Sequence, residues 1–238
     1  YIYGNTDYAT FNSVCCSWGT ADKFNKLIQL GYLCKLTTKR TSNEMDTSGI
    51  KMIGGDFSDK ELSNRFDREN VTNEIIKEVM AAGKDRKKWL FFAIDIDHAE
   101  HIAEILIRNG IKTAPIHSKM GDSGFCRVKT INKLKKGGYR AAVNVNILTT
   151  GFDDPEIDLI AVLRPTNSPV LHVQLNGRGS RVSPGKKDCL VLDFAGNTDR
   201  LGPINNPLIK VKGKGKGGGD PITKTCPDCQ SILAPAVR

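Results

Sequence analysis

Three short apolar runs, separated by other segments, constrain the fold of this 238-residue chain more than any other feature. They cover residues 88–93, 139–145 and 158–166, and each has the length and composition of a buried strand. Between the first two runs, residues 97–109 place apolar side chains at helical spacing and stop before Gly110. Strands that alternate with helices form right-handed βαβ units. The chain is therefore predicted to have an α/β fold with a mostly parallel sheet.

Polar residues follow the predicted strands at the points where the strands end. Asp95 follows the first strand, residues 144–153 follow the second, and residues 117–119 end a further extended segment. Ligands of parallel sheets bind at the carboxyl ends of the strands. We therefore expect a nucleotide or a phosphodiester to bind at this edge.

Two arginines lie three residues apart in the segment from residue 174 to residue 181. The segment is predicted to be helical, which would put Arg178 and Arg181 on one helix face. A guanidinium is always charged, and its rigid donors match phosphate oxygens. Such a pair suits the charge that develops on a transferring phosphoryl group. The alternative from the spacing alone is a basic helix end that faces solvent.

Three segments together resemble motifs IV, V and VI of superfamily 2 helicases: Phe91-Phe92-Ala93, Thr149-Thr150-Gly151-Phe152-Asp153 and Gln174-x-x-Gly177-Arg178-x-x-Arg181. Their order resembles that in the second RecA-like lobe of a DEAD/DEAH-type helicase. The flanking stretches, residues 32–49 and 192–205, are similar to those of RadD-type bacterial DNA-repair helicases. The resemblance extends over residues 30–238.

The resemblance implies a RecA-like three-layer domain over residues 36–207. Residues 1–35 would be the remnant of a first lobe with the interlobe linker, residues 208–224 a flexible Lys/Gly linker, and residues 225–238 an incomplete zinc-ribbon segment. The chain contains neither a G-x-x-x-x-G-K-[ST] phosphate loop nor an Asp-Glu-x-His or Asp-Glu-Ala-Asp run. We expect it to be the C-terminal part of a longer enzyme and to be inactive in ATP hydrolysis by itself.

The resemblance also implies roles for individual residues. Arg178 and Arg181 would be arginine fingers that reach the γ-phosphate of ATP, which the first lobe would hold together with Mg²⁺. The other residues expected near the ATP are Gly151, Asp153, Gln174 and Gly177. Contacts with the nucleic-acid backbone, which position a strand without reading its sequence, are expected from His117, Ser118, Lys119, Thr149 and Thr150.

The predicted function is that of the second motor lobe of an ATP-dependent DNA helicase or translocase in DNA repair. The net charge of +9 favours a polyanionic partner. The expected partners are single-stranded or branched DNA, with RNA as an alternative, the N-terminal RecA-like lobe of the same polypeptide, and a single-strand DNA-binding protein. No membrane partner is expected, since no apolar run approaches the roughly 18 residues of a membrane span.

The sequence leaves two alternatives to the helicase function. A non-catalytic nucleic-acid-binding module would also suit the basic charge, but it does not explain the order of the three motifs. A nucleotide-cofactor domain is disfavoured, because no G-x-G-x-x-G follows a predicted strand.

Seven cysteines without a regular framework favour a reducing compartment and a cytoplasmic location. Cys226 and Cys229 have the C-x-x-C spacing of zinc ligands, although a structural zinc site needs four. We expect half of a zinc ribbon, which would bind Zn²⁺ weakly or not at all in this chain. A free or redox-active pair is the alternative.

Helical periodicity predicts the burial of several further side chains. A helix over residues 71–82 is expected to bury a stripe formed by Val71, Ile75, Ile76 and Val79. His98 and His101 are expected to form a surface pair on the polar side of the helix over residues 97–109. His172 is expected to be packed or to cap its helix.

Overall fold

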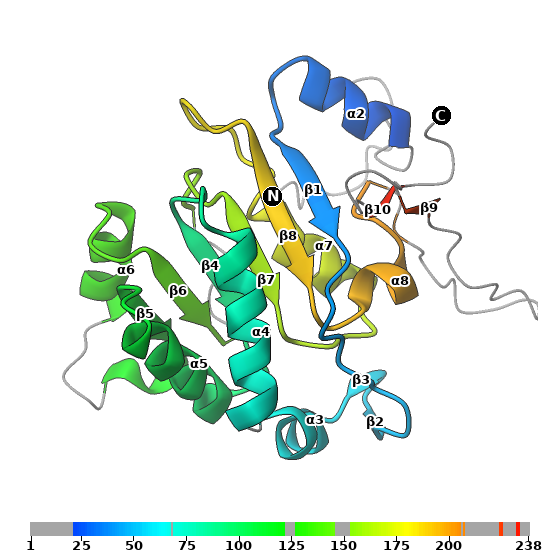
Figure 1. Cartoon of the computed structure of the whole chain (residues 1–238). Helices are drawn as coiled ribbons and strands as arrows, with labels where there is room; N and C mark the ends of the chain where they lie inside the picture. Colours follow the sequence, from blue (N-terminus) through cyan, green and yellow to red (C-terminus); the bar gives the residue numbers. More distant parts are fainter. Residues whose placement is uncertain are drawn as a thin grey trace, which may run out of the picture.

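A computed structural model describes residues 21–67, 69–121, 127–145, 153–205, 207, 224–225 and 232–233. Its centre is a sheet of six strands in which all neighbouring strands are parallel (Figure 1). Across the sheet the order is β1 (Lys35–Lys39), β8 (Asp188–Asp193), β7 (Leu159–Val162), β4 (Trp89–Phe92), β6 (Ala141–Asn144) and β5 (Thr113–Ile116). The predicted α/β fold with a parallel sheet is confirmed.

Helices cover both faces of the sheet and complete the three layers that were expected (Figure 1). One face is covered by α3 (Asp59–Phe66), α4 (Glu69–Ala82) and α5 (Ile96–Arg108). The other face is covered by α6 (Arg127–Lys135) and α7 (Pro169–Gly177). The smaller elements are α2 (Ala21–Gln29), the 3₁₀ helix η1 (Ser118–Gly121), α8 (Asn197–Leu201), and the ribbons β2 (Met52–Ile53) with β3 (Asp56–Phe57) and β9 (Lys224–Thr225) with β10 (Ile232–Leu233).

Residues of the central strands alternate between two cores. In β4, Trp89 and Phe91 belong to the core under α4 and α5, whereas Leu90 and Phe92 belong to the core under α6 and α7. All four are at most 1% exposed. Successive side chains of a strand point to opposite faces, so a strand that is covered on both sides is apolar throughout. This explains why the sequence shows unbroken apolar runs.

The helix after β4, α5, begins and ends within one residue of the predicted bounds, 97–109. The Asp95 carboxylate accepts a hydrogen bond from the His98 N–H at 2.9 Å and so caps the start of α5. Gly110 follows the helix with φ at +79°, a left-handed conformation that glycine adopts readily. The predicted apolar stripe is buried and comprises Ile102, Ile105 and Leu106.

The predicted core stripe of α4 is correct for Ile75, Ile76 and Val79 but wrong for Val71. Val71 is 37% exposed, whereas the neighbouring Thr72 is fully buried. Thr72 lies three and four residues before Ile75 and Ile76 and therefore stands at the centre of the buried stripe. Val71 stands at its margin, where solvent reaches it.

The prediction of a surface histidine pair is wrong for His98. This side chain is fully buried, because it lies four residues before Ile102 on the apolar stripe of α5. Its Nδ1 accepts a hydrogen bond from the Ile94 N–H at 3.4 Å, and burial lowers its pKa to about 4. His101 is half-buried, with Nδ1 2.8 Å from the Asp67 carboxylate.

Several predicted features lie outside the described residues. They are residues 1–20, the Lys/Gly tract within residues 208–223, and the residues Thr149, Thr150, Gly151, Cys226 and Cys229. In the part of the chain that the structure describes, no helix combines the length and the apolar character needed to cross a membrane.

Candidate functional site

The helix that leads to the two arginines, α7, follows β7 after the connection formed by residues 163–168. Ser168 caps α7 by accepting a hydrogen bond from the Leu171 N–H at 3.3 Å, and Pro169 stands in the first turn, where no N–H is required. His172 is buried, with Nε2 3.0 Å from the Gly202 carbonyl oxygen, and burial lowers its pKa. The prediction that His172 is a packed residue is confirmed.

The arginines do not share a helix face, so this prediction is wrong. α7 ends at Gly177, and Arg178 caps its end. Both the N–H and the Oγ of Ser180 donate to the Gly177 carbonyl oxygen, at 3.3 and 2.9 Å, which closes a tight turn. We call residues 178–181 the arginine turn.

The arginine turn lies at the edge of the sheet where the strands begin, which we call the amino edge. α7 starts near the carboxyl end of β7 and leads back to the start of β8, and the Ser180 carbonyl accepts a hydrogen bond from the Cys34 N–H, just before β1. Gly179 allows the close packing, because a Cβ there would lie 2.5 Å from the Cys189 Sγ. The arginines are thus at the opposite edge from the carboxyl ends of the strands, where the sequence analysis expects ligands.

An ion pair joins the arginine turn to the segment before β7. The Nη1 of Arg181 lies 3.0 Å from the Asp153 carboxylate, and the two side chains are 31% and 71% exposed. Arg178 is only 8% exposed, and Gln174 and Gly177 are half-buried near the end of α7. The structure therefore brings Arg181 together with Asp153, whereas Gln174, Gly177 and Arg178 lie beside one another at the end of α7.

The described residues that were predicted to contact nucleic acid, His117, Ser118 and Lys119, lie at the carboxyl edge, where the strands end. His117 follows β5 and is 6% exposed, with Nε2 2.9 Å from the Glu100 carboxylate on α5. Ser118 and Lys119 follow in η1 and are exposed. Asn144 is the last residue of β6, the strand beside β5 in the sheet, and it is buried.

Two lysines that the sequence analysis missed organise the amino edge. The Lys88 ammonium is buried between the carboxylates of Asp154 and Glu156, at 3.1 and 2.7 Å, and this contact lowers the pKa of Glu156. The Lys186 ammonium lies among backbone carbonyls of the arginine turn. The partners of Lys88 are more than 40 residues away in the sequence, and Lys186 binds backbone carbonyls, which every residue carries, so no local pattern identifies either lysine.

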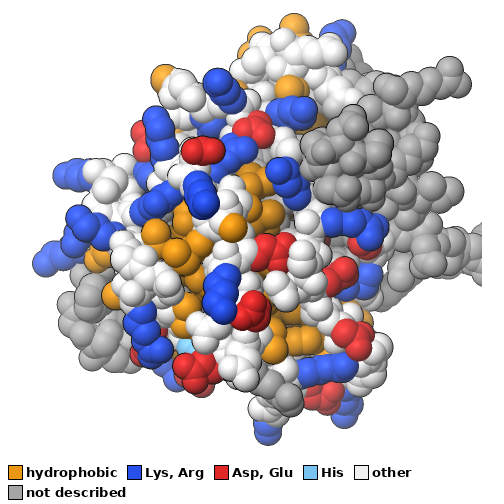
Figure 2. Space-filling model, in the orientation of Figure 1, with side chains coloured by type: hydrophobic (Ala, Val, Ile, Leu, Met, Phe, Trp, Pro, Cys, Tyr) orange, Lys and Arg blue, Asp and Glu red, His pale blue; other side chains and the backbone are white. Residues whose placement is uncertain are grey.

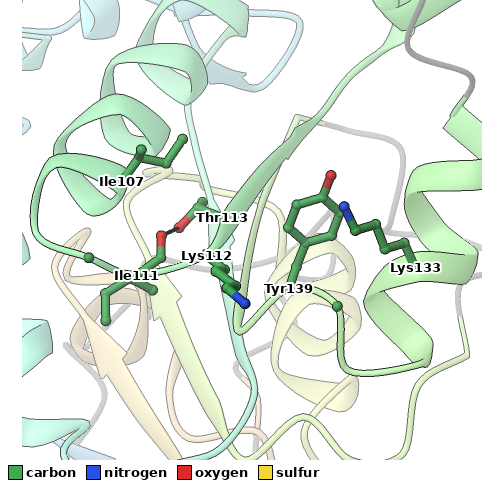
Figure 3. A pocket seen from close by; sticks show the side chains of 8 residues that line it. Ile107, Ile111, Lys112, Thr113, Lys133 and Tyr139 are labelled. Carbon is green, nitrogen blue, oxygen red and sulfur yellow. Dashed lines mark hydrogen bonds between the residues drawn. The ribbon is translucent and has the colours of Figure 1, made fainter.

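Two hollows of the described surface lie near the amino edge and near the ends of α5 and α6. A cleft of about 870 Å³ at the amino edge runs between residues 85–88 and residues 183–188, and its lining carries both basic and acidic side chains. A pocket of about 470 Å³ near the ends of α5 and α6 is lined by Ile107, Ile111 and Tyr139, with the Lys133 ammonium 4.6 Å from the centre of the Tyr139 ring (Figure 3). Neither lining includes a residue that was predicted to bind ATP, nucleic acid or a metal ion.

The charged side chains form no single basic patch on the face that carries α4 and α5. Figure 2 shows Lys and Arg side chains spread over this face, with acidic side chains among them. Within the described residues, no group of three or more His, Cys, Asp or Glu could hold a metal ion.

Comparison with known proteins agrees with this geometry. Residues 71–183 match the family described as "Helicase conserved C-terminal domain". IRC3 of Saccharomyces cerevisiae, whose name describes an ATP-dependent helicase, is 29% identical over 186 residues, which are 77% of this chain and 27% of that protein. UvrABC system protein B of Thermosipho africanus is 32% identical over 123 residues, which are 50% of this chain and 18% of that protein.

A solved structure shares the fold. A fragment of a type I restriction enzyme HsdR subunit from Vibrio vulnificus has a TM-score of 0.57 at 16% identity, and the match covers 81% of this chain and 38% of that chain. The chain spans less than a third of the length of the two curated relatives. Residues 71–183 of this chain therefore carry a helicase conserved C-terminal domain, which is built on the parallel sheet of a RecA-like α/β fold.

Proposed function

We propose that this chain is the second motor lobe of an ATP-dependent DNA helicase or translocase that acts in DNA repair. The ion pair between Arg181 and Asp153 carries the proposal, since it joins the last residues of motifs V and VI within one lobe. In this arrangement Arg178 and Arg181 reach the terminal phosphate of an ATP that is held by another lobe.

The surroundings of the two arginines suit this role. Arg178 is nearly buried, and Arg181 is restrained by Asp153. Side chains that are restrained before the ligand arrives lose little freedom when they meet it. Guanidinium groups that are already in place stabilise the charge on a transferring phosphoryl group with little rearrangement.

The other lobe is proposed to hold most of the ATP and the Mg²⁺. The chain has no phosphate loop, and its described residues offer no cluster of metal ligands. We propose that Gly151, Asp153, Gln174 and Gly177 approach the nucleotide from this side, and that Zn²⁺ binding through Cys226 and Cys229 requires further ligands in the full-length protein. The chain by itself is expected not to hydrolyse ATP.

Nucleic acid is proposed to bind at the carboxyl edge. Ser118 and Lys119 are exposed there, so a hydroxyl and an ammonium are available to phosphate oxygens. His117 is buried against Glu100 and would support the start of η1 rather than reach far into solvent. Thr149 and Thr150 are proposed to complete this surface, and DNA is favoured by the resemblance to RadD-type helicases.

The arginine role is tested in the full-length enzyme by nucleic-acid-stimulated ATP hydrolysis. Arg178→Ala and Arg181→Ala should each lower kcat by roughly 10³-fold or more, with a much smaller change in ATP affinity. Arg108→Ala is the matched control, because Arg108 is 63% exposed on α5, away from the arginine turn. Wild-type turnover in both test variants would contradict the proposal, and nucleic-acid binding without any turnover would favour a binding module.

A further inference from the structure

A lysine ammonium lies at the centre of the contacts that hold the arginine turn. The Nζ of Lys186 donates hydrogen bonds to the carbonyl oxygens of Gly179 and Arg181, each at 2.9 Å, and of Pro155 at 3.1 Å. An ammonium has three donors and no acceptor. The three carbonyls therefore use its full hydrogen-bonding capacity.

These carbonyls come from two separate segments of the chain. Gly179 and Arg181 belong to the arginine turn, whereas Pro155 lies two residues after Asp153 and leads into β7. Lys186 therefore connects, through backbone atoms, the same two segments that the Arg181–Asp153 ion pair connects through side chains. The half-exposed ion pair is weakened by solvent, whereas the charge-assisted contacts of Lys186 act on the backbone itself.

The position of Lys186 is set by the start of β8. Its N–H donates to the Ser183 carbonyl at 3.1 Å, and Gly185 has φ at +78°, so a tight turn precedes the lysine. Two residues later, Asp188 begins β8 and forms an ion pair with Arg86. The ammonium thus extends from an anchored segment toward the arginine turn.

We infer that Lys186 is a positioning residue that sets the place of Arg178 and Arg181 relative to Asp153. This inference rests on the proposed function, because the position of the turn affects hydrolysis only if the arginines reach ATP. Lys187 is the control position, which separates an effect of positioning from an effect of charge alone. It is exposed, lines the same cleft and has the same charge.

The test compares Lys186→Met with Lys187→Met in the full-length enzyme. Lys186→Met should lower kcat by roughly 10- to 100-fold, because small displacements of a catalytic group are costly, while KM for ATP changes much less. Lys187→Met should leave both constants close to the wild-type values. Hydrogen–deuterium exchange should be faster for residues 178–182 in Lys186→Met and unchanged in Lys187→Met.

The outcomes separate this inference from the proposed function. Wild-type kcat and wild-type exchange in a folded Lys186→Met protein would overturn the inference, even if Arg178→Ala is inactive. Equal losses in Lys186→Met and Lys187→Met would also overturn it, in favour of a charge effect. If Lys186→Met does not fold, Lys186→Gln replaces it, since its shorter, uncharged side chain has two donors and cannot bind all three carbonyls, and wild-type kcat together with wild-type exchange in that variant would overturn the inference. Full activity of both arginine variants would instead refute the proposed function.

Discussion

The amino edge and the carboxyl edge of the sheet hold their polar groups in different ways. At the amino edge, Arg178 is 8% exposed, the arginine turn is bound to Lys186, and Lys88 is buried with Asp154. At the carboxyl edge, Ser118 and Lys119 project from a short 3₁₀ helix into solvent. One edge is thus organised by internal contacts, whereas the other presents solvent-exposed polar side chains.

This difference matches what each edge is proposed to bind. Charge that develops on a phosphoryl group occupies one position, so the groups that stabilise it act best when they are held in place. A nucleic-acid backbone repeats the same phosphate along its length, and contacts that read no sequence require charge more than exact placement.

Removing the buried lysine should cause the largest loss of stability. Lys88→Met leaves the Asp154 carboxylate, which is 2% exposed, without its cation. Breaking a buried pair in this way costs about 3–5 kcal/mol, to be measured as the free energy of unfolding in denaturant. Lys87→Met is the control, because the Lys87 side chain is exposed and should change stability little. Equal stability of the two variants would show that the amino edge is not anchored by this cluster.

Acid should destabilise the carboxyl edge through His98, in the first turn of α5. Its pKa of about 4 in the folded protein lies below the ordinary value of 6.5, because burial disfavours the charged ring. Below pH 6.5 the unfolded chain binds a proton that the folded chain does not, so stability falls until about pH 4. At about 1.36 kcal/mol per pKa unit, the loss approaches roughly 3 kcal/mol.

The measurement is the free energy of unfolding between pH 7 and pH 4, compared in the wild type and in His98→Gln. Asp67, Asp95 and His101 also act on this ring, so the difference between the two profiles isolates the contribution of His98. The variant should show a flatter profile through this range. Two parallel profiles would mean that His98 is not buried as the structure shows.

A methyl group added to the arginine turn should have an intermediate effect. Gly179→Ala would force a Cβ against the Cys189 Sγ, and overpacking of this kind costs about 1–3 kcal/mol. Gly177→Ala is the control, because nothing lies within 4 Å of a Cβ at that position. Thermal unfolding should separate the two variants, and Cys189→Ala should restore part of the stability lost in Gly179→Ala. Equal melting temperatures would indicate that the turn is loosely packed.

A single lysine at the carboxyl edge should have the smallest effect. Lys119→Ala should weaken single-stranded DNA binding several-fold and reduce the slope of log affinity against log salt by about 1. Lys112→Ala is the control, because Lys112 is also exposed but lies at the start of β5 instead of its end. A greater loss of DNA affinity in the Lys112 variant would place the nucleic acid at the amino edge and break the contrast.

The elements that could be predicted from the sequence are those with a local signal. β4, β6 and β7 are covered on both faces and are therefore apolar throughout, and α5 shows a helical stripe between a capping Asp95 and Gly110. The strands β1 and β5 lie at the margins of the sheet and contain Thr, Lys or Pro, so they lack an apolar run. Their strand conformation follows from pairing with β8 and β6.

The candidate site likewise combines features that have a local sequence signal with features that depend on tertiary contacts. The spacing of Arg178 and Arg181 marked them as a pair, but the end of α7 before them depends on Ser180 and on the packing of Gly179 against Cys189. The burial of His98 likewise depends on the helices that cover it, and it was missed because histidine is common on both surfaces and interiors.

By itself, the sequence determined the alternation of strands and helices, the parallel sheet and the identity of the two arginines. Periodicity and residue type are local properties, and they record which side of each element is buried. Only the tertiary structure decided that the arginines lie at the amino edge, that Asp153 meets Arg181 and that Lys186 binds Pro155. Each of these contacts joins residues about 30 positions apart in the sequence. The residues meet because the chain crosses the sheet between them, so no local pattern predicts the contact.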